Sequence, residues 1–207
     1  MNKLIVSCLL LTGLCGLVSA QQADNFKRTE FYVGYAVELA DSKARDLRDL
    51  HGFEASAVYN FMRFVGVKGD FSATFNEQRV AQNGYNLNVP FSQTFRRSNS
   101  LINALGGVQI KDNALKGKVK PFVHALIGTS FGNSTIDEYS CTSVQSCPFF
   151  LYGSEDRNGL AAALGGGLDL KIKNGVKVRV FQVDYNPVHF SSSNTQTNVR
   201  IGAGFVF

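Results

Sequence analysis

Apolar residues recur at every second position along most of this chain, and this pattern constrains its fold more than any other feature. The C-terminus is the clearest case, because polar or small residues lie between its apolar ones, which are Val199, Ile201, Ala203, Phe205 and Phe207. Side chains of a β-strand point alternately to opposite faces, whereas those of a helix repeat every 3.6 residues. The pattern therefore predicts a chain made of strands, with no helix of any length after the first twenty residues.

Eight segments carry the alternation, and they cover residues 28–39, 52–61, 64–75, 95–110, 118–131, 159–170, 176–185 and 197–207. Short connections alternate with long polar ones, which cover 40–51, 76–94, 132–158 and 186–196. Short turns at one end and long loops at the other are typical of a bacterial outer-membrane barrel, and a tilted strand crosses a bilayer in about 9–11 residues. We therefore expect an all-β fold, an eight-stranded antiparallel up-and-down transmembrane β-barrel.

Isolated charged residues lie on the less apolar face of these strands. A charge facing lipid at the bilayer midplane costs about 2–4 kcal/mol, and eight strands enclose an interior just wide enough for side chains to fill. We therefore expect a polar network in the lumen, with at least one cross-strand ion pair made by Lys68 or Arg200. Its expected members are Glu38, Glu54, Lys68, Asp70, His124, Asp169 and Arg200. The alternative is the solvated outer face of a soluble sandwich.

The seventh strand changes phase in its middle. Its apolar residues are first even-numbered and then odd-numbered, in the order Val176, Val178, Val180, Phe181, Val183 and Tyr185. A regular strand cannot keep both sets on one face. The switch predicts a bulge near Val180 and Phe181, since one extra residue restores the phase. The alternative is a regular strand whose upper half lies above the bilayer.

The first twenty residues have the features of a secretory signal peptide. Lys3 precedes an apolar run over residues 4–18, and the small residues Ser19 and Ala20 follow it. An anchor helix is the weaker alternative, because glycines interrupt the run and a span needs about 20 apolar residues. The expected division is a signal peptide at 1–20 and a barrel at 21–207, located in the outer membrane after export.

Two cysteines remain once the signal peptide is removed. Cys141 and Cys147 lie six positions apart in the expected loop 132–158. An oxidising compartment favours a disulfide between them. Zinc is the alternative, but no histidine or further cysteine lies nearby in the sequence. We therefore expect the disulfide, which would stiffen the loop.

Four segments resemble the outer-membrane β-barrel domain family, which includes small barrels of the OmpA and OmpX type. They are Pro121–Leu126, Leu164–Leu170, Val178–Tyr185 and Asn198–Gly204. The resemblance extends over essentially all of residues 21–207. It implies the same eight-stranded barrel. It also implies that Phe207, with the alternating apolar residues back to Val199, is the signal read by the barrel-insertion machinery.

The sequence offers little catalytic or cofactor chemistry. His124 could serve a lipid-modifying enzyme if a serine lay beside it, but nothing in the sequence places Ser130 or Ser191 there. The triple glycine at 165–167 is not followed by the helix that a phosphate-binding loop needs. The sequence pI is near 9.1, but the basic residues are scattered, which argues against nucleic acid as a partner. We expect no enzymatic activity, no metal and no cofactor.

Three functions remain open at this point. The first is a structural or porin-like barrel with a narrow, plugged polar lumen and long extracellular loops. The second is a surface adhesion barrel that binds an extracellular ligand through those loops, and the third, less favoured, is a lipid-modifying enzyme. In each case the expected partners are outer-membrane lipid and the insertion machinery, and the expected state is a monomer.

Overall fold

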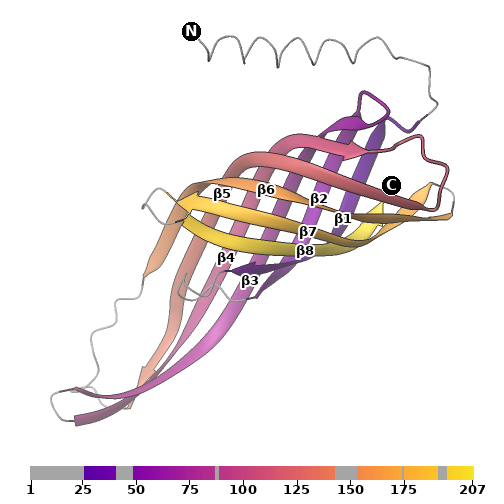
Figure 1. Cartoon of the computed structure of the whole chain (residues 1–207). Helices are drawn as coiled ribbons and strands as arrows, with labels where there is room; N and C mark the ends of the chain where they lie inside the picture. The colour runs from indigo at the N-terminus through magenta and orange to yellow at the C-terminus, as the bar shows by residue number, and fades with distance from the viewer. Residues whose placement is uncertain (1–25, 41–48, 87–88, 143–152, 174, 191–194) are drawn as a thin grey trace, which may run out of the picture.

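The chain folds as a closed antiparallel β-barrel (Figure 1). The computed structural model describes residues 26–40, 49–86, 89–142, 153–173, 175–190 and 195–207. Each strand pairs with the next in sequence, and β8 pairs with β1 to close the barrel. Among the described residues, none belongs to a helix long and apolar enough to cross a membrane. The predicted fold class is therefore confirmed.

The eight strands differ twofold in length, from 11 residues in β2 to 23 residues in β4 and β5. Their bounds are β1 Thr29–Ala40, β2 Leu50–Asn60, β3 Val65–Asn86, β4 Val89–Lys111, β5 Val119–Cys141, β6 Ser154–Lys173, β7 Val176–Phe190 and β8 Thr195–Val206. Both described ends of the chain and the three tight turns lie at one end of the barrel, which is the periplasmic end in barrels of this layout.

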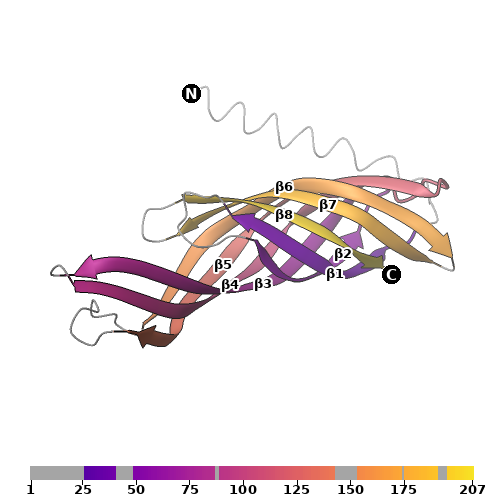
Figure 2. The ribbon, with the colours of Figure 1, turned by 90° about the horizontal axis from the view of Figure 1, so that it is seen from below.

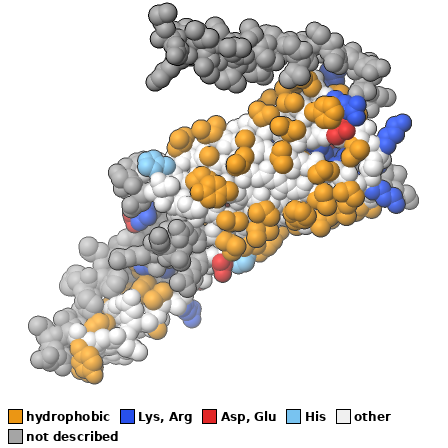
Figure 3. Space-filling model, viewed as in Figure 1, with side chains coloured by type: hydrophobic (Ala, Val, Ile, Leu, Met, Phe, Trp, Pro, Cys, Tyr) orange, Lys and Arg blue, Asp and Glu red, His pale blue; other side chains and the backbone are white. Residues whose placement is uncertain are grey.

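The exposed surface of the barrel wall is apolar and its interior is largely polar. In β1, for example, Phe31 and Tyr35 are 57% and 56% exposed, whereas Glu30 and Glu38 are buried. Figure 3 shows the hydrophobic side chains spread over the outside of the barrel. This arrangement is the reverse of a soluble protein, and it fits a wall surrounded by lipid.

Three of the predicted long loops are wrong in part, because the strands continue into them. β3 and β4 remain paired up to Asn86 and Val89, so that 76–94 is mostly a β-hairpin. β5 and β6 likewise extend into 132–158, and β7 extends to Phe190. These segments are polar on both faces, so they lack the period-2 signal. Backbone pairing needs no such signal, and it continues beyond the hydrocarbon region.

Three of these strands project beyond the rest of the barrel at its extracellular end (Figures 1 and 2). We call residues 76–86 of β3, 89–99 of β4 and 133–141 of β5 the extension. The last pair between β2 and β3 is His51 with Phe75, so β3 has no described partner on that side beyond this point. Among the described residues, no strand therefore pairs with the β3 edge of the extension.

The predicted bulge in β7 is confirmed. On the β6 side Leu168 pairs with Phe181 and Asp169 with Arg179, which skips Val180. The register with β8 shifts at the same place. Val180 and Phe181 are both exposed, at 44% and 47%. The extra residue restores the phase, and it turns the polar side chains on both sides of the bulge into the barrel.

Two predictions fall wholly or partly outside the described residues. The signal peptide at 1–20 lies outside them. Cys147 also lies outside them, while Cys141 is the last residue of β5 and pairs with Gln93 in the ladder with β4. The disulfide stays a prediction, which alkylation before and after reduction tests.

Candidate functional site: the barrel interior and the extension

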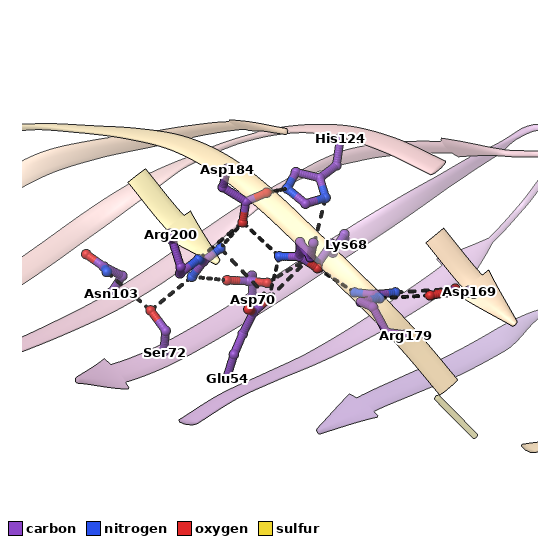
Figure 4. A network of polar contacts seen from close by, with 11 residues as sticks. Glu54, Lys68, Asp70, Ser72, Asn103, His124, Asp169, Arg179, Asp184 and Arg200 are labelled. Atoms are coloured by element: carbon purple, nitrogen blue, oxygen red, sulfur yellow. Dashed lines mark hydrogen bonds and ion pairs between the residues drawn. The ribbon is translucent and has the colours of Figure 1, made fainter. Parts of the chain in front are cut away.

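Arg200 of β8 lies at the centre of a buried ionic network (Figure 4). Its guanidinium nitrogens lie 2.8 Å from an oxygen of Asp184 and 2.9 Å from an oxygen of Asp70. It also donates a 2.9 Å hydrogen bond to the hydroxyl of Ser72, and Glu54 lies at 3.9 Å. The side chains in these four contacts come from β2, β3 and β7, so one cation joins strands on different sides of the barrel.

Lys68 of β3 supplies the second cation of this network. Its ammonium lies 2.9 Å from Asp70 and 3.8 Å from Glu54, and 3.5 Å from Nδ1 of His124. The other ring nitrogen of His124 lies 2.9 Å from Asp184. Lys68, Glu54 and Asp184 are all fully buried. The ionic contacts therefore form a closed circuit across the lumen, since Arg200 also contacts Asp184.

A second ionic group lies toward the periplasmic end. The ammonium of Lys111 lies 2.6 Å from Asp169 and 2.9 Å from Glu30, and Lys177 also pairs with Glu30. Arg179 lies 2.9 Å from Asp169. Its guanidinium also lies over two aromatic rings, those of Tyr32 at 4.2 Å and Phe122 at 4.1 Å. Contacts of this kind stabilise a desolvated cation by cation–π attraction.

Among the described residues, Glu38 is held by side-chain amides rather than by a direct ion pair. Asn186, Asn198 and Asn103 donate hydrogen bonds of 2.9, 3.0 and 3.4 Å to its carboxylate. All four side chains are buried. Three donors satisfy most of the acceptor capacity of a carboxylate, which a buried position requires.

The seven residues predicted for the lumen all lie inside the barrel. Five of them share the network around Arg200, while Asp169 lies in the second group and Glu38 among its asparagines. The structure adds members that sequence reasoning missed, namely Glu30, Lys111, Lys177, Arg179, Gln182 and Asp184. The β7 residues among them could have been predicted to point inward, because they alternate with apolar residues on either side of the bulge. The expected cross-strand ion pairs are present.

The lumen is not polar throughout, which the sequence did not predict. A cluster of buried apolar side chains also points inward, and we call it the apolar layer. Its members are Leu50, Leu101, Leu105, Leu126, Ala161, Ala163, Val188 and Phe190. Leu50 begins β2 and Phe190 ends β7, so the layer reaches the extracellular end of these strands. An enclosed interior can be packed with apolar side chains as a soluble core is.

The other two histidines make hydrogen bonds to hydroxyl groups, and the glycine at 165 is explained by close packing. His51 accepts or donates a 2.8 Å hydrogen bond with the hydroxyl of Tyr35, and His189 contacts Thr195 at 2.9 Å. A side chain at Gly165 would collide with Asp184 at 2.1 Å, which explains a small residue there. In the described part of the chain, no group of three or more His, Cys, Asp or Glu side chains is placed to hold a metal ion.

The extension carries a network of exposed charges. Arg96 of β4 lies 3.2 Å from Glu77 and 3.1 Å from Glu138, and Arg79 lies 3.6 Å from Glu138. Glu138 has a φ of 51°, in the left-handed region, and it lies where the β4–β5 register shifts. Nearby, a cleft of about 290 Å³ opens at the mouth of the barrel. Its lining includes Arg97, Asn99, Ser134, Arg157, Phe190 and Gln196.

A family profile decides the relationship of this chain to known proteins. The profile described as "Outer membrane protein beta-barrel domain" matches residues 7–207. The chain belongs to this family. It is therefore an outer-membrane protein, and its fold and surface agree with that location. None of the curated proteins matches it.

Several solved outer-membrane barrels are similar to this family member. Ail, the attachment invasion locus protein of Yersinia pestis, was solved in complex with the heparin analogue sucrose octasulfate. It is 17% identical, with a TM-score of 0.49 over 86% of this chain and 97% of that chain. Neisserial surface protein A is 12% identical, with a TM-score of 0.48 over 87% and 96%. The N-terminal barrel of Pseudomonas aeruginosa OprF is 12% identical, with a TM-score of 0.39 over 88% and 100%.

Proposed function

We propose that this protein is a closed outer-membrane barrel with a structural role, and that it does not let solutes diffuse through its lumen. The complete burial of Arg200, Lys68 and Glu54 carries this proposal. A porin needs a continuous path of water, and cross-lumen ion pairs occupy the space that such a path would take. The apolar layer adds a second barrier, because apolar constrictions exclude water and hence ions.

The closed barrel predicts very small conductance. The refolded protein in planar bilayers should give no stepwise currents, and liposomes that contain it should not swell in solutions of small sugars. A general porin reconstituted in the same way provides the control for sensitivity. Regular current steps from the folded protein, at the same frequency in repeated preparations, would contradict a closed lumen and support the porin-like function.

A second function is favoured by the extension. We propose that it contacts a partner outside the cell, as an adhesion barrel would. Its support is the continuation of β3, β4 and β5 beyond their neighbours. In the described part of the chain no strand pairs with the β3 edge there, and Glu77, Arg79 and Glu138 carry exposed charges. A strand edge can bind an extended segment of another protein. A barrel that served only as a wall would not need this projection.

We expect that the β3 and β4 strands of the extension can be removed without disturbing the barrel. Asn76 pairs with Asn99, so replacing residues 77–98 with Asn-Gly leaves a hairpin closed by a favourable two-residue turn. We expect this variant to fold, as judged by its heat-dependent mobility on gels. Cells that express it should adhere to epithelial monolayers no better than cells without the protein, while the full chain increases adhesion. Equal adhesion by the full chain and the shortened chain would contradict a role for the extension.

We further propose that the chain is not an enzyme. The ring nitrogens of His124 face Asp184 and Lys68 inside the barrel, where the side chain is 2% exposed and lipid cannot reach it. The mass of lipid A should therefore be the same with and without expression of the protein.

The partners that we propose are the lipid around the barrel and the insertion machinery. That machinery would read the outward residues of β8 and Phe207, so Phe207→Ala is expected to lower the assembled amount.

A further inference from the structure

Basic side chains surround part of the periplasmic end of the barrel. They come from the residues just before β1, the turns β2–β3 and β4–β5, and the end of β6, and all of them are exposed. We call Lys27, Arg28, Arg63, Lys116, Lys118 and Lys171 the basic collar. In Figure 3 the blue side chains gather at the right-hand end, which is the end where Figure 1 places the C-terminus.

Backbone hydrogen bonds hold the segments of the collar next to one another. The amide of Asn60, at the end of β2, donates to the carbonyl of Arg28 at 2.6 Å. The amide of Asn113 donates to the carbonyl of Arg63 at 3.0 Å, and the amide of Lys171 to that of Lys118 at 2.8 Å. The collar is therefore one continuous surface, although its residues lie far apart in the sequence.

Little negative charge offsets the collar. Asp112 is the acidic residue in the described turns at this end, and it accepts hydrogen bonds of 3.0 and 3.2 Å from Arg63. These bonds lower the pKa of the Asp112 carboxyl, so it stays ionised and offsets one cation of the collar.

The extracellular end has the opposite balance. Its described charged residues are Arg79, Arg96, Arg97 and Arg157 against Asp49, Glu77, Asp137, Glu138, Glu155 and Asp156. Many of these form ion pairs with one another, as Arg157 does with Glu155 at 2.7 Å. Among the described residues, the excess of positive charge is thus a property of the periplasmic end.

Apolar side chains place the collar at the level of the lipid headgroups. Phe64, Leu115, Val119 and Ile172 are 50%, 38%, 46% and 64% exposed, and each adjoins a basic residue of the collar in the sequence. The guanidinium of Arg63 lies 4.9 Å from the ring centre of Phe64. Aromatic and long basic side chains anchor proteins at the boundary between hydrocarbon and headgroups. The cations are therefore at the depth of lipid phosphates rather than out in the periplasm.

We propose that the basic collar binds the phosphate groups of anionic phospholipids in the leaflet that faces the periplasm. Clusters of Lys and Arg at a membrane surface attract anionic lipids, and charge-assisted hydrogen bonds to phosphate are strong. The collar offers six cations on one arc. This inference does not depend on the closed lumen or on the role of the extension.

Measuring whether the barrel binds anionic lipid in preference to neutral lipid tests this proposal. The refolded protein is placed in phosphatidylcholine membranes with spin-labelled phosphatidylglycerol or spin-labelled phosphatidylcholine, and the fraction of each label held by the protein is measured by electron paramagnetic resonance. We expect a roughly threefold preference for phosphatidylglycerol, which falls at 0.5 M NaCl because salt screens exposed charges. In the variant Lys116→Gln, Lys118→Gln, Lys171→Gln the preference should fall close to one.

A matched control removes the same number of charges from the other end. The variant Arg79→Gln, Arg96→Gln, Arg157→Gln should keep the full preference. Equal loss in both variants, or no preference in the unaltered protein, would overturn the proposal, as would collar-dependent binding to purified peptidoglycan without any lipid preference. If the collar variant fails to insert, the salt dependence of the lipid preference of the unaltered protein still tests the proposal. Lys→Arg replacements at the same three positions should retain the preference.

Discussion

Replacing Arg200 with methionine is expected to lower the free energy of unfolding by about 3–5 kcal/mol, the usual cost of breaking a buried ion pair on one side. Arg200 contacts the carboxylates of Asp184 and Asp70 at 2.8 and 2.9 Å, and that of Glu54 at 3.9 Å. Methionine fills much of the same space but supplies no charge. Three buried carboxylates would then depend on Lys68 and His124, and they would lack most of the compensation that their burial requires.

An exposed ion pair provides the control for this prediction. Arg157 pairs with Glu155 at 2.7 Å, but the two side chains are 44% and 63% exposed. Arg157→Met should therefore cost between about 0 and 1 kcal/mol, as surface pairs do. Both variants are refolded into lipid vesicles and unfolded with urea, with circular dichroism and gel mobility as the measures of folding. If Arg200→Met is no more destabilising than Arg157→Met, the network does not contribute as we propose.

The sequence predicts the part of this fold that the bilayer dictates. Within the hydrocarbon region one face of each strand must be apolar, so period-2 alternation identifies the strands and their phase, and even the bulge at Val180. In the extension this requirement is absent. Both faces of residues 76–85 are at least partly exposed, and the apolar alternation disappears although the pairing of β3 with β4 continues to Asn86. The ends of these strands could therefore not be predicted, because outside the hydrocarbon region nothing requires apolar residues at every second position.

The composition of the interior could be predicted better than its contacts. Phase alone places Lys68 and Arg200 inside, but the partners that meet across the lumen depend on the tilt and stagger of all eight strands. The pair of Lys111 with Glu30, which lie 81 positions apart, is an example.

The apolar layer was missed for another reason. In β4 both faces carry apolar residues, and alternation cannot tell inward Leu101 and Leu105 from outward Ile102.

Two adjacent glycines of β4 should respond in opposite ways to the same substitution. Gly107 pairs with Leu126 of β5 and faces the interior, beside buried Lys68 of β3. A Cβ atom there would lie 2.1 Å from the carbonyl oxygen of Ala125 and 2.8 Å from the Cα of Leu126. Both are backbone atoms, so no side chain can move aside to make room. A larger residue must push β4 away from β5 at a point where the small barrel brings their backbones together.

We expect Gly107→Val to lower the free energy of unfolding by about 3 kcal/mol or more, beyond the usual cost of overpacking because the clash is with backbone, or to prevent folding altogether. Gly106 is the control, because a Cβ atom there meets nothing within 4 Å and points to the lipid. Gly106→Val should change stability by less than about 1 kcal/mol, as surface substitutions do. Both variants add the same side chain one position apart in one strand, so differences in β propensity cancel. Urea unfolding in vesicles and the yield of the heat-modifiable folded band measure the effect, and similar losses in both variants would show that the close approach of β4 and β5 does not limit folding.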